Sequence, residues 1–108
     1  MPALLQTPLP ALDDREDDHV QAALPAVIDA HVHLFPDHMF ASIWQWFEKF
    51  GWPVRYRLGS PEVIEFLLSR GVSRIVGLQY AHKPGIAREL NVYMSRFCRR
   101  YQQLTGMA

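Results

Sequence analysis

Hydrophobic and polar residues alternate from residue 26 to residue 34, and this period of two predicts a β-strand. Successive side chains of a strand point to opposite faces. One face is expected to be apolar and to pack against helices, and it carries Ile28, Ala30, Val32 and Leu34. The other face is expected to carry Asp29, His31 and His33. Proline cannot continue a central strand, so Pro36 closes this element.

The pattern then becomes helical. Apolar residues recur at helical spacing over residues 39–50, and Gly51 with Pro53 ends that run. A second helix is expected to begin at Ser60, a favourable N-cap residue, and to stop at Gly71. Two helices are therefore expected after the first strand.

A second strand and a long helix complete the pattern. Residues 73–80 have an apolar centre and predict the strand, and residues 81–85 predict a loop. One apolar stripe predicts a helix over residues 86–104, with Gly106 just past its end. Strands that alternate with helices imply parallel strands joined by right-handed crossovers. The sequence therefore predicts the α/β class.

Length and composition set the size of the folded part. With 108 residues the chain forms one domain at most. Prolines and acidic residues dominate residues 1–24, which are predicted to be a flexible, solvated tail, so the domain is expected over residues 25–108. The 11 basic and 11 acidic residues cancel. The arginines are scattered along the sequence rather than arranged in a stripe, which argues against nucleic-acid binding.

The single cysteine and the absence of a long apolar run bear on location. Cys98 permits no internal disulfide, and its helical pattern beside Met94 and Phe97 predicts a buried thiol. No stretch approaches the roughly 18 apolar residues of a membrane span, and the first residues lack the basic start of a signal peptide. We expect a cytoplasmic protein that binds neither membranes nor nucleic acids.

His31 and His33 are the candidate metal ligands. Residues two apart on a strand point to the same side, so both imidazoles can reach one ion. Five histidines in 108 residues give about 0.2 such pairs by chance, so the spacing alone is weak. The pair stands at the carboxyl end of the first strand, where parallel α/β folds bind ligands. Two interpretations remain: a metal site, or a solvated strand face whose histidines have no chemical role.

Residues 28–36, Ile-Asp-Ala-His-Val-His-Leu-Phe-Pro, resemble the first-strand signature of the amidohydrolase superfamily. The nearest branch is the amidohydrolase-related one, which includes aminocarboxymuconate-semialdehyde decarboxylase. A weaker resemblance extends over roughly residues 25–106. It implies a (β/α)₈ TIM barrel, of which this chain carries the first two βα units and is incomplete. It also implies that His31 and His33 bind a divalent metal, usually zinc, whereas the later ligands of the family have no counterpart here.

The resemblance implies a metal-dependent hydrolase that cleaves a C–N or C–O bond of a small-molecule substrate. A non-oxidative decarboxylase of the same branch is one alternative. The other alternative is a non-enzymatic α/β chain that binds metal weakly or not at all. No catalytic residue is assigned, because two imidazoles leave the metal without a positioned base. Two parallel strands with open edges also predict marginal stability and self-association.

Other residues near the expected metal site are candidates for substrate binding. His38 and His82 are expected in the loops that follow the first and second strands, on the same side of a barrel. Five aromatic residues follow the histidine pair. Core packing is the expected role of this cluster, and an apolar wall over the pocket is the alternative; its members are Trp44, Trp46, Phe47, Phe50 and Trp52.

Overall fold

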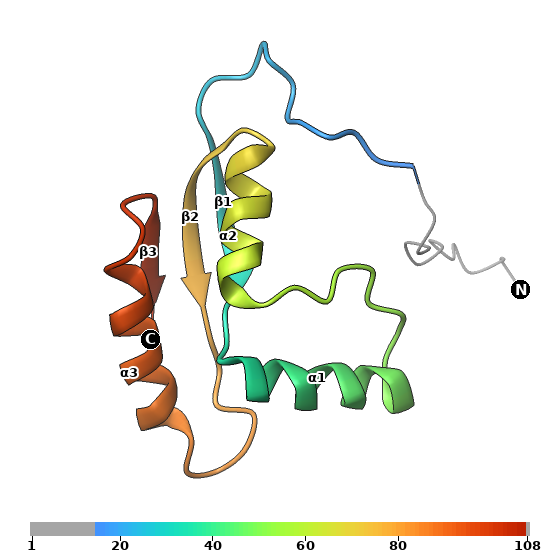
Figure 1. Cartoon of the computed structure of the whole chain (residues 1–108), viewed down its shortest axis with the longest axis vertical. Coiled ribbons are helices and arrows are strands. Elements are labelled where there is room, and N and C mark those ends of the chain that lie inside the picture. The colour runs from blue at the N-terminus through green and yellow to red at the C-terminus, as the bar shows by residue number, and fades with distance from the viewer. Residues whose placement is uncertain (1–14, 108) are drawn as a thin grey trace, which may run out of the picture.

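The computed structural model describes residues 15–107 and confirms an α/β arrangement. Three parallel strands form an open sheet in the order β1-β2-β3. Figure 1 shows the elements in chain order: β1 (Val27–His33), α1 (Asp37–Phe50), α2 (Ser60–Ser69), β2 (Val72–Leu78), α3 (Ala87–Cys98) and β3 (Leu104–Met107). None of the helices within residues 15–107 is long and apolar enough to cross a membrane.

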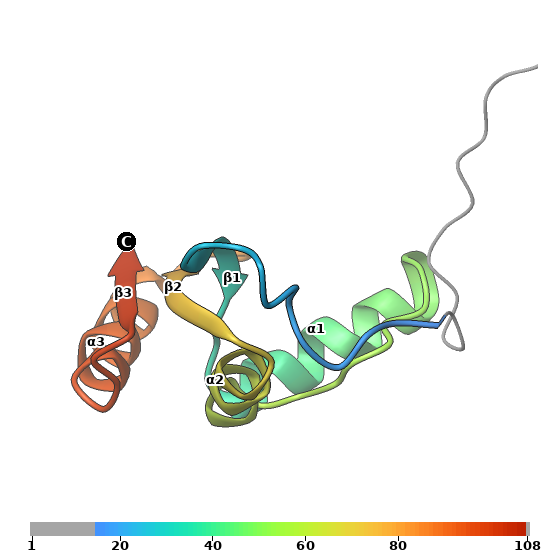
Figure 2. The ribbon, with the colours of Figure 1, turned by 90° about the horizontal axis from the view of Figure 1, so that it is seen from above.

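Two of the helices cover one face of the sheet. Seen from above, α2 and α3 lie on the same side of the strands, while α1 extends away beyond β1 (Figure 2). The main core fills the space between these helices and the sheet, and includes Leu34, Ile64, Ile75, Met94, Phe97 and Leu104. No helix from the described part of the chain covers the opposite face, which we call the open face.

A second, smaller cluster joins the start of α1 to the start of α3. Phe35, Met39 and Phe40 are buried there with Ile86 and Leu90. The cluster lies beyond the carboxyl ends of β1 and β2, at the turns where the chain leaves the strands (Figure 1). It therefore anchors the first turns of α1, while the later turns of that helix extend away from the sheet.

The predicted helix over residues 86–104 is wrong over its last third, residues 99–104. Helix α3 ends at Cys98, and residues 104–107 form a third strand parallel to β2. Leu104 fits a helical stripe in the sequence, but its side chain fills the core as the first residue of β3. The added strand also pairs the edge of β2, where unpaired backbone groups would otherwise remain.

Strand β1 does not keep the strict alternation that its sequence predicts. Asp29 is in register with Ile75 and Val32 with Gly77, so β1 contains an extra residue, a β-bulge. The predicted faces are therefore wrong at three positions, one of which is Ala30, an exposed residue that was expected on the packed face. Ile28 is 59% exposed and lies with the histidines on the open face, whereas Asp29 is half-buried and shares a face with Ile75.

Ser60 begins α2 but does not act as its predicted N-cap. The N-cap position belongs to Gly59, and no side chain caps the helix. Ser60 is fully buried, and its hydroxyl donates to the Phe35 carbonyl at 2.8 Å and accepts from the Phe35 N–H at 3.0 Å. The serine therefore fixes the backbone where the chain leaves β1.

Part of the predicted N-terminal tail contacts the fold, and residues 1–14 of it lie outside the described residues. The Val20 N–H donates to the Arg70 carbonyl at 2.8 Å, and the Val20 side chain packs against the main core. The Glu16 carboxylate lies 4.0 Å from the Arg70 guanidinium. Residues 16–20 thus touch the domain that the sequence predicts to begin at residue 25.

Candidate metal site

His31 and His33 stand together on the open face at the carboxyl end of β1. Their Nε2 atoms are 3.2 Å apart, and the two rings meet edge to face with centroids 4.8 Å apart. Both side chains are exposed. The bulge lies between Asp29 and Val32 and so includes His31, and both His31 and His33 are on the exposed side of the strand. The structure therefore brings the two predicted ligands together.

The separation of the two Nε2 atoms suits a shared metal ion. Zinc binds histidine nitrogen at about 2.0–2.1 Å, and two such ligands at a tetrahedral angle lie about 3.3 Å apart. The observed 3.2 Å also suits a hydrogen bond from one imidazole to the other. The geometry is thus compatible with a metal-bound pair and with a hydrogen-bonded pair.

The surroundings of His33 favour its neutral form. Burial lowers the pKa of the His33 imidazole, and the neighbouring His31 lowers it further. A hydrogen bond between the ring and the backbone of Leu78 acts in the opposite direction and helps to orient the ring. A neutral imidazole is the form that binds a metal, so a lowered pKa keeps His33 competent as a ligand.

The described residues supply two candidate ligands and no third. Within residues 15–107 no group of three histidine, cysteine or carboxylate side chains converges on one point. Asp29 is the nearest carboxylate in sequence, and its Oδ1 accepts a hydrogen bond from the His31 backbone N–H at 3.2 Å. This contact supports the bulge that presents His31. Asp29 therefore shapes the backbone of the site.

His82 and Tyr80 extend the site from the loop after β2. The Tyr80 ring meets the His33 ring edge to face at 5.2 Å, and His82 lies next to Tyr80 with centroids 6.1 Å apart. Tyr80 was missed by sequence reasoning. The available signal was its position just past the second strand, because carboxyl ends of parallel strands meet at one edge of a sheet.

A hollow of about 400 Å³ opens between α1 and this loop. His82 lines it, so the structure places this predicted substrate residue at a cavity beside the histidine pair. Tyr80 also lines it and contacts His33, which makes the hollow and the candidate metal site neighbours. The full lining is Ser42, Ile43, Trp46, Phe47, Tyr80 and His82.

His38, the other predicted substrate residue, has a different position. It lies in the first turn of α1, not in a loop, and its Nε2 is 3.1 Å from a carboxylate oxygen of Glu89 on α3. Its side chain is 67% exposed, and it does not line the hollow that His82 faces. This contact joins the first turns of two helices. A role in substrate binding stays a prediction for His38.

The expected core packing is wrong for three of the five aromatic residues, whereas Trp44 packs against the smaller buried cluster as expected. Trp46 is 53% exposed, Phe50 is 71% exposed and Trp52 is 54% exposed. The cause is the direction of α1, which leaves the sheet after its first turns (Figure 1). Trp46 and Phe47 instead form part of the wall of the hollow, which matches the alternative interpretation of an apolar wall.

Comparisons of this chain with family models, with curated proteins and with solved structures found no match. The metal assignment therefore depends on the geometry of the histidine pair and on the resemblance of residues 28–36 to the amidohydrolase signature.

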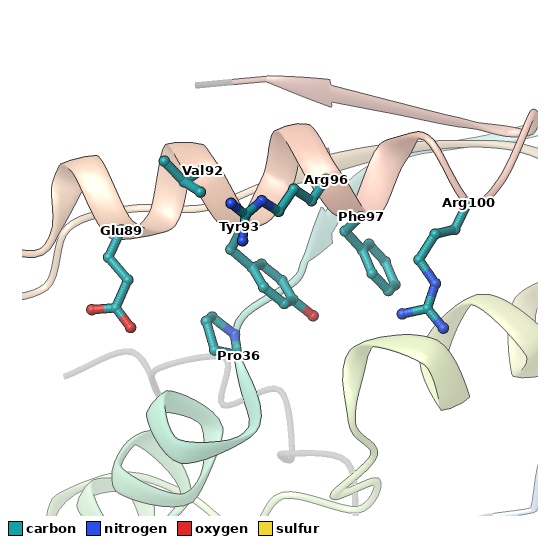
Figure 3. Close-up of a pocket in the computed structure, with 7 residues that line it drawn as sticks. All are labelled: Pro36, Glu89, Val92, Tyr93, Arg96, Phe97 and Arg100. Carbon is teal, nitrogen blue, oxygen red and sulfur yellow. The ribbon is translucent and has the colours of Figure 1, made fainter.

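A second groove, of about 300 Å³, lies on the helix-covered side of the sheet. Figure 3 shows Tyr93 and Phe97, which extend from α3, and Arg100, which follows that helix. The three side chains point toward Pro36 and α2. Burial raises the pKa of the Tyr93 hydroxyl. This groove belongs to the packing between helices and is separated from the histidine pair by the sheet.

Proposed function

We propose that this chain provides the first two metal ligands, His31 and His33, of a metal-dependent hydrolase of the amidohydrolase type. The observation that carries the proposal is the 3.2 Å separation of their Nε2 atoms at the carboxyl end of β1. When bound there, a divalent metal such as zinc activates water for cleavage of a C–N or C–O bond. A third ligand and a general base come from outside residues 15–107 in this proposal.

The arrangement of the sheet supports a barrel as the parent architecture. The strands follow the order β1-β2-β3, all parallel, with both covering helices on one face. A (β/α)₈ barrel has this sequential order and keeps its helices outside, whereas doubly wound sheets carry helices on both faces. In a barrel the open face becomes the interior, and the histidine pair then lies at the end where barrel enzymes bind substrate.

Metal binding is tested by zinc titration of the 108-residue chain. We expect one weakly held zinc ion, because two protein ligands are fewer than the three of a catalytic site. The NMR signals of the His31 and His33 rings should shift, and those of His38 and His82 should not. Replacing both ligands (His31→Ala with His33→Ala) should abolish binding, whereas His38→Ala should leave it unchanged. Binding that survives the double replacement would overturn the assignment.

The reaction class is tested on the protein purified from its native cell. We expect amide, lactone or aryl ester substrates to be hydrolysed, with activity lost on treatment with a chelator and restored by zinc. Release of CO₂ from an aromatic acid, without hydrolysis, would instead select the decarboxylase alternative. Absence of both metal and activity would select the non-enzymatic alternative.

A further inference from the structure

Four of the six residues that line the hollow between α1 and the loop after β2 have ring side chains. Trp46 and Phe47 come from α1 and meet edge to face with centroids 5.2 Å apart. Tyr80 and His82 come from the loop and face them across the hollow. Its volume of about 400 Å³ lies within the range of small-molecule sites. Such walls suit a flat, apolar group that presents its faces and edges to other rings.

The charge of the side chains that line the hollow limits the class of ligand that can bind there. No lysine, arginine, aspartate or glutamate from the described part of the chain lines it. A charged ligand group would lose its hydration there without gaining a partner of opposite charge. The ligand group inside the hollow is therefore uncharged. The hydroxyl of Ser42 is directed to the His38 carbonyl at 3.3 Å, which leaves the aromatic side chains to dominate recognition.

Tyr80 connects the hollow to the candidate metal site. One side of its ring meets His33 at a centroid distance of 5.2 Å, and the same side chain lines the hollow. A ring held between Trp46 and Tyr80 is thus separated from the His33 imidazole by one aromatic side chain.

We infer that the hollow binds the uncharged aromatic ring of an aryl amide or aryl ester, beside the candidate metal site and separated from it by Tyr80. The inference rests on the proposed hydrolase and names its substrate class. It assigns Trp46, Phe47 and Tyr80 to substrate binding, and it gives His82 a place at the rim of the same site.

The test uses benzamide as the aromatic probe and cyclohexanecarboxamide as its non-aromatic counterpart. The chain has three tryptophans, whose indole N–H signals can be followed by NMR during titration. We expect benzamide to shift the Trp46 signal and not that of Trp52, and we expect the cyclohexane compound to bind more weakly. Trp46→Ala should raise the Kd for benzamide about tenfold.

Tyr56→Ala is the control, because Tyr56 is an exposed aromatic residue (39%) whose ring contacts Phe66 of α2, and neither residue lines the hollow. The control should bind benzamide like the unaltered chain. Circular dichroism checks that both variants fold. Equal loss of binding in the two variants, or equal binding of the two probes, would overturn the inference.

Zinc titration of the same variants separates this inference from the proposed function. We expect Trp46→Ala to bind zinc normally. We expect His31→Ala, which keeps the contact between His33 and Tyr80, to lose zinc binding and to bind benzamide normally. Zinc binding without benzamide binding would refute the aromatic site alone. Benzamide binding without zinc binding would support the aromatic site and refute the metal-dependent hydrolase.

Discussion

At the scale of single residues, Ser60 connects two elements that are 25 positions apart in sequence. Its buried hydroxyl makes hydrogen bonds to both backbone groups of Phe35. Phe35 is itself buried and follows the histidine pair by two residues. The serine therefore helps to fix the end of β1 where the candidate metal ligands stand.

Replacing Ser60 with alanine should destabilise the fold by about 2 kcal/mol, because both buried backbone groups of Phe35 lose a partner. Urea denaturation measures this change in the free energy of unfolding. Ser69→Ala is the control, since its hydroxyl bonds to the Phe66 carbonyl at an exposed site, and its effect should stay within about 0.5 kcal/mol. Equal effects of the two replacements would contradict the role given to Ser60.

Cys98 is half-buried beside β3, and its environment determines its reactivity. Burial raises the pKa of the Cys98 thiol, while a hydrogen bond with the Gly106 backbone acts in the opposite direction. The thiolate is the reactive form, so a raised pKa lowers its fraction at any pH below that pKa. This agrees with the structural role that the helical pattern predicts.

Alkylation of Cys98 by iodoacetamide at about pH 8 should be several-fold slower in the folded chain than in concentrated urea. The rate in the folded chain should rise as the pH rises toward the elevated pKa, because more thiolate forms. Mass spectrometry of the modified chain gives both rates. Equal rates with and without urea would show that burial does not protect the thiol.

At the scale of elements, the bulge in β1 is the feature that presents the histidine pair. The bulge places both Ala30 and His31 on the exposed side. The Asp29 carboxylate accepts a hydrogen bond from the backbone N–H of His31 at 3.2 Å. An acidic side chain that hydrogen-bonds to the backbone two residues on is a common way to stabilise such irregular backbone. Asp29 thus acts on the candidate metal site through the main chain.

Asp29→Ala should weaken zinc binding about tenfold, because His31 loses the contact that holds its backbone in place. Asp29→Asn keeps an oxygen that accepts the same hydrogen bond and should bind zinc nearly as well as the unaltered chain. Calorimetric titration of the two variants gives both affinities. A direct carboxylate ligand would make the two replacements equally damaging, and that result would refute the backbone role.

At the scale of the whole molecule, the open face exposes apolar side chains that a finished sheet would cover. Ile28 is 59% exposed and Met107 is 54% exposed, while Val76 and Leu78 are half-buried between them. Exposed apolar surface of this kind marks a contact surface. The edge of β1 away from β2 has no neighbouring strand among the described residues.

We therefore expect the 108-residue chain to self-associate, and Ile28→Lys to reduce the association. The reason is that the lysine places a charge on the apolar surface that a second copy would cover. Val92→Lys is the control, because Val92 is 45% exposed on α3, on the other side of the sheet. Sedimentation velocity over a range of concentrations measures the effect. A monomeric chain, or equal effects of the two replacements, would contradict the expectation.

The sequence by itself determined the features that depend on neighbouring residues. Alternation of strands and helices predicted the parallel α/β arrangement, and β1, α1, α2 and β2 lie within a few residues of their predicted bounds. The closeness of His31 and His33 also follows from local geometry, because residues two apart on extended backbone share a side. The pattern of apolar and polar residues over a short stretch of sequence carries this information directly.

The tertiary structure decided every feature that joins residues far apart in the chain. Leu104 satisfies a helical stripe and a strand equally well, and only pairing with β2 selects the strand. The bulge that reverses Ile28 and Asp29 depends on register with β2, and the hollow forms because Tyr80 and His82 meet α1. These features depend on contacts between different elements. A short stretch of sequence does not reveal them, because the partner residues lie elsewhere in the chain.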